Sequence, residues 1–228
     1  MLIHVPRVLN ESQVREFRRK LADAGWVDGR GTAGHQSMLV KHNLQLPESD
    51  PVARELSAAV LAALERNPLF FTAALPGYIF PPLFNCYRAG DGFGNHIDNA
   101  VRYDRSVQPA RPVRTDLSVT LFLSGPEEYA GGELVIEDSS GLHQVKLPAG
   151  DLVLYPSNSV HRVETVTRGE RIASFFWLQS FVRDSGERQL LFELDRAIQK
   201  LGRDLASHPA VIELTGVYHN LLRRWTEL

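Results

Sequence analysis

The spacing of apolar residues predicts two helices within the first seventy residues. The first begins after Asn10, which forms an N-cap and N3 pair with Gln13. The second begins at Asp50, a capping residue followed by proline, and stops near residues 67–68. In both segments apolar residues recur every three or four positions, as one buried helix face requires. These stripes are Val14, Phe17 and Leu21, and then Val52, Leu56, Val60 and Leu64. We therefore expect residues 1–77 to form an N-terminal helical region that packs on the rest of the chain.

The pattern changes near residue 78, where short runs of β-branched and aromatic residues are separated by glycine, proline, aspartate and serine. Seven strands are expected, at Leu83–Arg88, Leu117–Ser124, Glu133–Glu137, Gln144–Leu147, Asp151–Tyr155, His161–Thr167 and Arg171–Val182. Short antiparallel strands at this spacing indicate a sandwich, a barrel or a double-sheet jelly roll. We assign residues 78–182 to this β core.

After Asp184 the apolar residues return to helical spacing. One stripe contains Leu190, Leu194, Ile198 and Leu201, and another contains Leu214, Tyr218, Leu221 and Trp225. Such stripes are typical of packing surfaces rather than ligand sites. Residues 183–228 are thus expected to form a small C-terminal helical segment, whose exposed faces could join copies of the chain into a homodimer or homotetramer. The expected fold is mainly β with flanking helices.

Composition and charge narrow the range of partners. A net charge of −2 over 228 residues provides no basic field for nucleic acid or an acidic membrane surface, so we expect neither as a partner. No run of about 18 apolar residues predicts a membrane span, and the first residues lack the pattern of a secretory signal. The single cysteine, Cys86, excludes an internal disulfide framework and suits a reducing compartment. We therefore predict a cytoplasmic protein.

His96 and Asp98 are the first candidates for chemistry, because they stand two residues apart. In extended backbone, residues i and i+2 point to the same face, so both side chains can reach one metal ion. The pair is weak evidence by itself. With 8 histidines and 12 aspartates in the chain, a His-x-Asp is expected by chance about 0.4 times, and an exposed surface pair is the simpler interpretation.

A second group of residues changes this balance. His161 opens a strand after the apolar run 150–156, and Arg171 begins a strongly apolar strand ten residues later. If Arg171 points inward, it needs an anionic partner; alternatively, it faces solvent beside the turn and pairs with Glu170. Two histidines and one carboxylate leave three coordination positions open, as in non-haem Fe(II) oxygenases. A 2-oxo acid can fill two of them, and an arginine can hold its far carboxylate through a bidentate fork.

Several short motifs together resemble one family. They are Cys86-Tyr87-Arg88-Ala89-Gly90, His96-Ile97-Asp98, Gly131-Gly132-Glu133-Leu134, Gly150-Asp151-Leu152, and His161 followed by Arg171. Over about residues 80–180 the sequence is similar to the prolyl/lysyl-hydroxylase-like 2-oxoglutarate oxygenases, and within them to the bacterial PKHD-type hydroxylases. The ending from Leu191 to Trp225 also looks like that of the PKHD subgroup.

The resemblance implies a fold, a site and a reaction. It implies a double-stranded β-helix (jelly-roll) core in which His96, Asp98 and His161 hold Fe(II). It places Arg171 at the position that binds 2-oxoglutarate, and Tyr87 at a position that can hydrogen-bond this co-substrate. The expected reaction uses O₂, converts 2-oxoglutarate to succinate and hydroxylates a substrate, with ascorbate as a candidate reductant. The substrate is a small molecule or a peptide, and the subgroup is often associated with bacterial iron acquisition.

The sequence departs from the family at one position and leaves other functions open. Several relatives carry a tyrosine in the strand that corresponds to residues 120–123, where the best match here, Phe122, has no hydroxyl. A non-catalytic sensor of iron or 2-oxoglutarate would have the same site. A cupin-like Zn²⁺ hydrolase or isomerase would need a catalytic acid near the metal and would give Arg171 no role. Residues 29–36 and 99–115 are the two candidates for a loop that covers the substrate.

Overall fold

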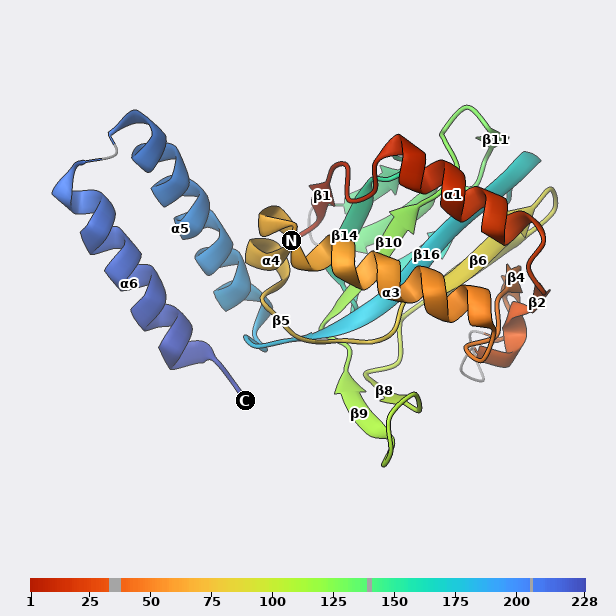
Figure 1. Ribbon diagram of the computed structural model, residues 1–228, viewed down its shortest axis with the longest axis horizontal. Helices are drawn as coiled ribbons and strands as arrows, with labels where there is room; N and C mark the ends of the chain where they lie inside the picture. The colour runs from red at the N-terminus through yellow and green to blue at the C-terminus, as the bar shows by residue number, and fades with distance from the viewer. Residues whose placement is uncertain (33–37, 139–140, 206) are drawn as a thin grey trace.

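The chain folds into a β body with helices on one face and a helical hairpin at one side (Figure 1). The computed structural model describes residues 1–32, 38–138, 141–205 and 207–228. Within these residues the strands form a nine-stranded sheet, a five-stranded sheet and a separate two-stranded ribbon. The expected fold class, mainly β with flanking helices, is confirmed.

The larger sheet is built around β16 (Arg168–Ser180), a strand of 13 residues. The order of this sheet is β1 (Ile3–Val5), β14 (Leu152–Pro156), β10 (Leu117–Phe122), β16, β6 (Leu83–Arg88), β4 (Leu44–Gln45) and β2 (Val27–Asp28), and both β5 (Pro76–Ile79) and β11 (Tyr129–Ala130) also pair with β16. The smaller sheet runs β13 (Gly141–Val145), β12 (Leu134–Asp138), β15 (Val160–Val163), β7 (Gly92–His96) and β3 (Lys41–His42), while β8 (Val101–Asp104) and β9 (Arg111–Arg114) form the ribbon. Each of the seven strands predicted from the sequence corresponds to one of these, and the bounds of β6 are the predicted ones.

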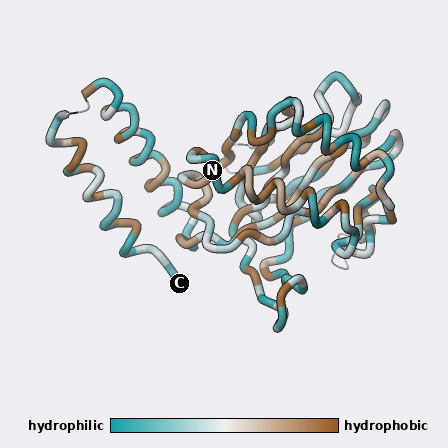
Figure 2. Tube along the Cα trace, in the orientation of Figure 1, coloured by the Kyte–Doolittle hydropathy of each residue, from teal (hydrophilic) through white to brown (hydrophobic). Residues whose placement is uncertain are grey.

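Three helices pack on the outer face of the larger sheet: α1 (Glu11–Ala22), α3 (Pro51–Glu65) and α4 (Pro68–Ala74). The capping box predicted for α1 is present, because the Asn10 side chain accepts from the Gln13 N–H and the Gln13 side chain accepts from the Asn10 N–H. The Asp50 carboxylate caps α3 as expected. In Figure 2 apolar positions alternate with polar ones along these helices, as burial of one helix face requires.

One expectation for the first 77 residues is confirmed and another is wrong. The second predicted helix stops where expected, because α3 ends at Glu65 with Arg66 as its C-cap; the Asn67 side chain then accepts from the Phe70 N–H and caps a further helix, α4. The region is not wholly helical, since β1 to β5 add strands to the two sheets. Strands β1 to β4 have only two or three residues each, too few for an alternating pattern to reveal them. Their positions depend on distant partners, such as the pairing of Ile3 with Leu154.

The two faces of the larger sheet carry different residues, because successive side chains of a strand point to opposite sides. On β10, Leu117, Val119 and Leu121 belong to the main hydrophobic core under the helices. The alternate residues Ser118 and Thr120 point toward the smaller sheet and line a pocket between the two sheets. The larger sheet thus stabilises the fold with one face and builds a site with the other.

The C-terminal helices α5 (Ser185–Asp204) and α6 (Pro209–Trp225) pack against each other and stand beside the β body (Figure 1). Buried Leu75, Val182 and Leu191 join them to the body in a small apolar cluster, and Val182 forms a β-bridge with Thr226. In the part of the chain that the structure describes, no helix is both long and apolar enough to cross a membrane.

The two candidate substrate loops have different structures. Residues 99–115 contain β8 and β9, so this segment is an ordered hairpin rather than an irregular loop. Of residues 29–36, the first four form the 3₁₀ helix η1 (Gly29–Thr32), whereas residues 33–36 lie outside the described residues.

Candidate metal centre

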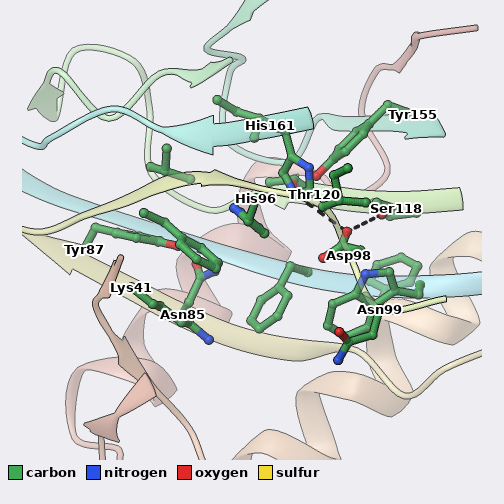
Figure 3. Close-up of a pocket in the computed structure, with 18 of the residues that line it drawn as sticks. Lys41, Asn85, Tyr87, His96, Asp98, Asn99, Ser118, Thr120, Tyr155 and His161 are labelled. Carbon is green, nitrogen blue, oxygen red and sulfur yellow. Dashed lines mark hydrogen bonds and ion pairs between the residues drawn. The ribbon is translucent and has the colours of Figure 1, made fainter. Parts of the chain in front are cut away.

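Three side chains that the sequence singled out meet at one end of the smaller sheet. His96 is the last residue of β7 and pairs with His161 of the neighbouring strand β15. Asp98 follows two residues after the end of β7. Each of the three offers a ligand atom within 4.8 Å of the others, and the His161 Nε2 lies 3.6 Å from the Asp98 Oδ2. Figure 3 shows the three side chains converging on one point.

Backbone carbonyl groups orient both imidazole rings. The Nδ1 of His96 lies 2.9 Å from the Gly94 carbonyl oxygen, and the Nδ1 of His161 lies 3.0 Å from that of Ser159. A ring that donates its Nδ1–H to a carbonyl keeps Nε2 unprotonated and available to a metal. Burial, and next the nearby His161, lower the pKa of His96 to about 4. The His96 ring is therefore neutral at neutral pH, as metal ligation requires.

Packing and hydrogen bonds hold the remaining parts of the cluster. The Phe93 ring stacks on His96 with centroids 3.6 Å apart and an interplanar angle of 13°. The Ser118 hydroxyl donates to the Asp98 Oδ2 over 2.6 Å, and its oxygen is hydrogen-bonded to the Ser157 hydroxyl at 2.7 Å. A carboxylate held in this way has a fixed orientation, which favours a defined coordination geometry.

Arg171 points inward. Its side chain is 1% exposed, and its guanidinium carbon lies 5.4 Å from the centre of the Tyr87 ring and 5.3 Å from that of Phe122. Within the described residues no carboxylate forms an ion pair with it, and its Nε has no hydrogen-bond acceptor. The alternative of a solvent-facing pair with Glu170 is wrong, because Glu170 pairs with Arg88 instead. A buried cation without a counter-charge is costly unless a ligand supplies one, so this position fits an anion.

Tyr87 and Phe122 surround this arginine. Tyr87 lies directly opposite Arg171 in the β6–β16 register, and burial raises the pKa of its phenol to about 12. The phenol therefore stays protonated and can donate a hydrogen bond to an anion beside Arg171. Phe122 is fully buried and offers no hydroxyl, as expected from the sequence, so its ring can only pack against the guanidinium.

The cluster and Arg171 open into one pocket of about 740 Å³, its mouth included. Among the described residues that line it, Asp98 is the only acid, whereas Lys41, Arg102 and Arg171 are bases. Burial, and next the charge of Arg102, lower the pKa of Lys41 to about 8. A second carboxylate that could act as the catalytic acid of a hydrolase is absent from this described lining. The pocket therefore favours an anionic ligand and argues against the Zn²⁺ hydrolase alternative.

The sequence did not identify every residue of the site. Lys41, Ser118 and Tyr155 line the pocket but carry no motif, and they reach it from strands far apart in the chain. Only the alternation along β10 could have placed Ser118 on the inner face. Arg102 lies in the predicted substrate segment 99–115, but nothing in the sequence distinguished it from the other arginines there.

The residues present fit Fe(II) and 2-oxoglutarate. Two imidazoles and one carboxylate give a nitrogen and oxygen donor set with room for further ligands, which suits Fe(II). The guanidinium of Arg171, which has no carboxylate partner among the described residues and whose Nε has no acceptor, fits the far carboxylate of a dicarboxylic acid.

Comparisons with known proteins agree with this fit. A family model of the 2OG-Fe(II) oxygenase superfamily matches residues 82–179, and a model of the PKHD-type hydroxylase C-terminal domain matches residues 185–227. The chain is 60% identical to a PKHD-type hydroxylase of Xanthomonas campestris over 228 residues, and 59% identical to the PKHD-type hydroxylase PiuC of Pseudomonas aeruginosa over 229 residues, with 100% of each chain covered.

Solved structures share the fold at lower identity. A Pseudomonas putida prolyl-4-hydroxylase has a TM-score of 0.51 at 22% identity, covering 78% of this chain and 92% of its own. HygX from Streptomyces hygroscopicus, solved with nickel and 2-oxoglutarate bound, has a TM-score of 0.52 at 17% identity, covering 79% of this chain and 84% of its own. These similarities confirm the predicted jelly-roll core.

Proposed function

The chain belongs to the PKHD-type hydroxylases of the 2OG-Fe(II) oxygenase superfamily, and from this membership we propose that it hydroxylates a C–H bond of its substrate. One atom of O₂ enters the substrate as a hydroxyl group, and the other enters 2-oxoglutarate, which becomes succinate and CO₂. The observation that carries the proposal is the burial of Arg171, without a counter-charge among the described residues, in the pocket that also holds the His-Asp-His cluster.

Each residue of the site has a proposed role. His96, Asp98 and His161 hold Fe(II), which together with 2-oxoglutarate and O₂ supplies the oxidising chemistry of the reaction. Arg171 binds the far carboxylate of 2-oxoglutarate through two parallel N–H donors, and the protonated Tyr87 phenol offers another donor beside it. The rings around the cluster exclude water from it, which strengthens the interactions of the buried charges.

Formation of succinate tests this proposal against the sensor alternative. The Fe(II)-loaded protein is incubated in air with 2-oxoglutarate, ascorbate and a panel of peptides and small carboxylic acids, and succinate is quantified. We expect succinate from the wild-type protein with at least one panel member, and none above background from His161→Ala. Binding of 2-oxoglutarate without succinate from any member of the panel would instead favour a non-catalytic sensor.

Three further predictions concern the setting of the protein. The family resemblance supports a role in bacterial iron acquisition, and induction of the gene by iron starvation would test it. A cytoplasmic location stays a prediction, which fractionation of cells that express the protein would test. Assembly into a homo-oligomer stays a prediction. Exposed apolar residues on α5 and α6, such as Leu190 and Ile212, are the surface proposed for it. Sedimentation of variants that carry a charged residue at these positions would test this assembly.

A further inference from the structure

The β8–β9 hairpin places a second arginine, Arg102, in the lining of the pocket. Its guanidinium carbon lies 4.1 Å from the centre of the Trp177 ring and 5.3 Å from that of Phe80. The hairpin is fixed in place, because Val113, which pairs with Arg102, is fully buried with Phe80 and Trp177. At the end of β8 the Tyr78 hydroxyl donates to the Asp104 carboxylate over 2.6 Å.

Arg102 has no protein partner for its charge in the described part of the chain. Its Nε is buried without a hydrogen-bond acceptor, and no ion pair or hydrogen bond of the described residues includes it. Burial lowers its pKa, while Glu48 and Asp98 raise it only through longer-range attraction. An aromatic stack satisfies the face of a guanidinium but not its N–H groups. The buried Nε–H of Arg102 therefore lacks an acceptor among the described residues, and a bound anion can supply one.

The co-substrate does not use this arginine. In the β10–β16 register Ser118, which holds Asp98, stands opposite Trp177. Arg171 precedes Trp177 by six residues on β16, so the Cα atoms of these two residues are roughly 20 Å apart at the usual rise per residue of a strand, and the long Arg171 side chain reaches the pocket from that distant part of the strand. In the proposed function one end of 2-oxoglutarate chelates the metal and its far carboxylate reaches Arg171, so both of its carboxylates have partners. Arg102 lies near the opposite end of the pocket and is left for the substrate.

The residues around Arg102 indicate the charge and polarity of the ligand that it binds. Lys41 lines the same pocket, and the charge of Arg102 helps to lower its pKa, so an anion between the two cations relieves their repulsion. Phe175 and Trp177 form an aromatic wall with ring centres 5.6 Å apart, which suits an apolar body. Resting on the proposed function, we propose that the substrate is an apolar molecule with a carboxylate, and that Arg102 binds this carboxylate and so determines specificity.

Two matched pairs of probes test the inference. One pair is phenylacetate and phenylacetamide, and the other is a short acetylated peptide that ends in phenylalanine, with a free or an amidated C-terminus. Binding is measured by calorimetry, without oxygen, on the protein saturated with Fe(II) and 2-oxoglutarate, so that the metal and Arg171 are already occupied. The variant is Arg102→Gln, and the control is Arg111→Gln, which removes the same charge from an exposed position of the same hairpin.

We expect the wild-type protein and Arg111→Gln to bind an acid more tightly than its amide. Arg102→Gln should lose about 10- to 100-fold in affinity for the acid and little for the amide, the factor for a lost hydrogen bond to a charged group. Preference in the first pair identifies a small carboxylic acid as the substrate, and preference in the second identifies a peptide C-terminus.

Three results would overturn the inference: no preference for either acid, a preference that survives in Arg102→Gln, or weaker 2-oxoglutarate binding in this variant with no change for the acids. If 2-oxoglutarate fails to bind the wild-type protein, the proposed function fails and the inference fails with it. If 2-oxoglutarate binds normally and no acid is preferred, the inference alone fails.

Discussion

Ser118→Ala should weaken metal binding without unfolding the protein. The Ser118 hydroxyl donates to the Asp98 Oδ2 over 2.6 Å and is itself hydrogen-bonded to Ser157. A hydrogen bond to a charged group contributes about 1.5–3 kcal/mol. Loss of a group that orients a metal ligand typically lowers affinity by about 10- to 100-fold. We expect the dissociation constant for Fe(II) to rise by this factor, because Asp98 keeps its charge but loses its fixed direction.

The assay is anaerobic calorimetric titration of the metal-free protein with Fe(II), accompanied by urea unfolding. Ser174→Ala is the matched control, since Ser174 is fully buried on the opposite face of the same sheet and its hydroxyl has no partner among the described residues. This control should bind Fe(II) like the wild-type protein, and its unfolding free energy should be equal or higher. If Ser118→Ala is folded and binds Fe(II) as tightly as Ser174→Ala, the hydrogen bond does not position Asp98 and the reasoning is refuted.

Three further predictions concern pH, backbone and metal. Burial lowers the pKa of Lys41 from 10.5 to about 8. The charged Lys41 therefore destabilises the folded state by its full amount below pH 8, and this destabilisation decreases as the pH rises toward 10.5. Lys41→Met should raise the unfolding free energy at pH 7 by at most about 3 kcal/mol. The rise in Tm of the wild-type protein between pH 8 and pH 10 should be absent from this variant, and a parallel rise in both would contradict the assignment. A Cβ on Gly131, where φ is +70°, would lie 2.1 Å from the Thr165 carbonyl oxygen, whereas one on Gly90, where φ is +96°, would meet no atom within 4 Å. Gly131→Ala should therefore cost clearly more in urea unfolding than Gly90→Ala, whose backbone strain is about 1–2 kcal/mol, and equal costs would show that the close approach is unimportant. Fe(II) at 100 times its dissociation constant should stabilise the wild-type protein by about 2.7 kcal/mol and leave His161→Ala unchanged, so an equal rise in the Tm of both proteins would place the ion elsewhere.

The regular elements could be predicted from the sequence because their signals are local. The α1 capping box lies within four residues, and the alternating pattern of β6 lies within the strand itself. The short strands β1 to β4 could not be predicted, because partners such as Leu154 for Ile3 determine where they form. Near Asn67 the end of α3 was predicted correctly, but the start of α4 at the same residue was not, since a helix cap and a helix end use the same residue types.

The candidate site divides in the same way. The metal cluster could be predicted from the spacing of His96 and Asp98 and from the motifs around His161. The structure brings these three residues together. The direction of Arg171 was undecided, because only the strand register determines which face of the sheet it occupies. Arg102 could not be chosen from among the arginines of residues 99–115, since its importance comes from Trp177, which is brought beside it only by the fold.

The most direct test of the central claim is anaerobic titration of the metal-free protein with Fe(II) and then 2-oxoglutarate, while a visible metal-to-ligand charge-transfer band is recorded. We predict that the band appears with the wild-type protein, is absent from His161→Ala, and requires at least tenfold more 2-oxoglutarate with Arg171→Gln. Arg88→Gln, which removes an exposed arginine from the same sheet, should titrate like the wild-type protein. A folded, iron-loaded wild-type protein that gives no band and binds no 2-oxoglutarate would contradict the account.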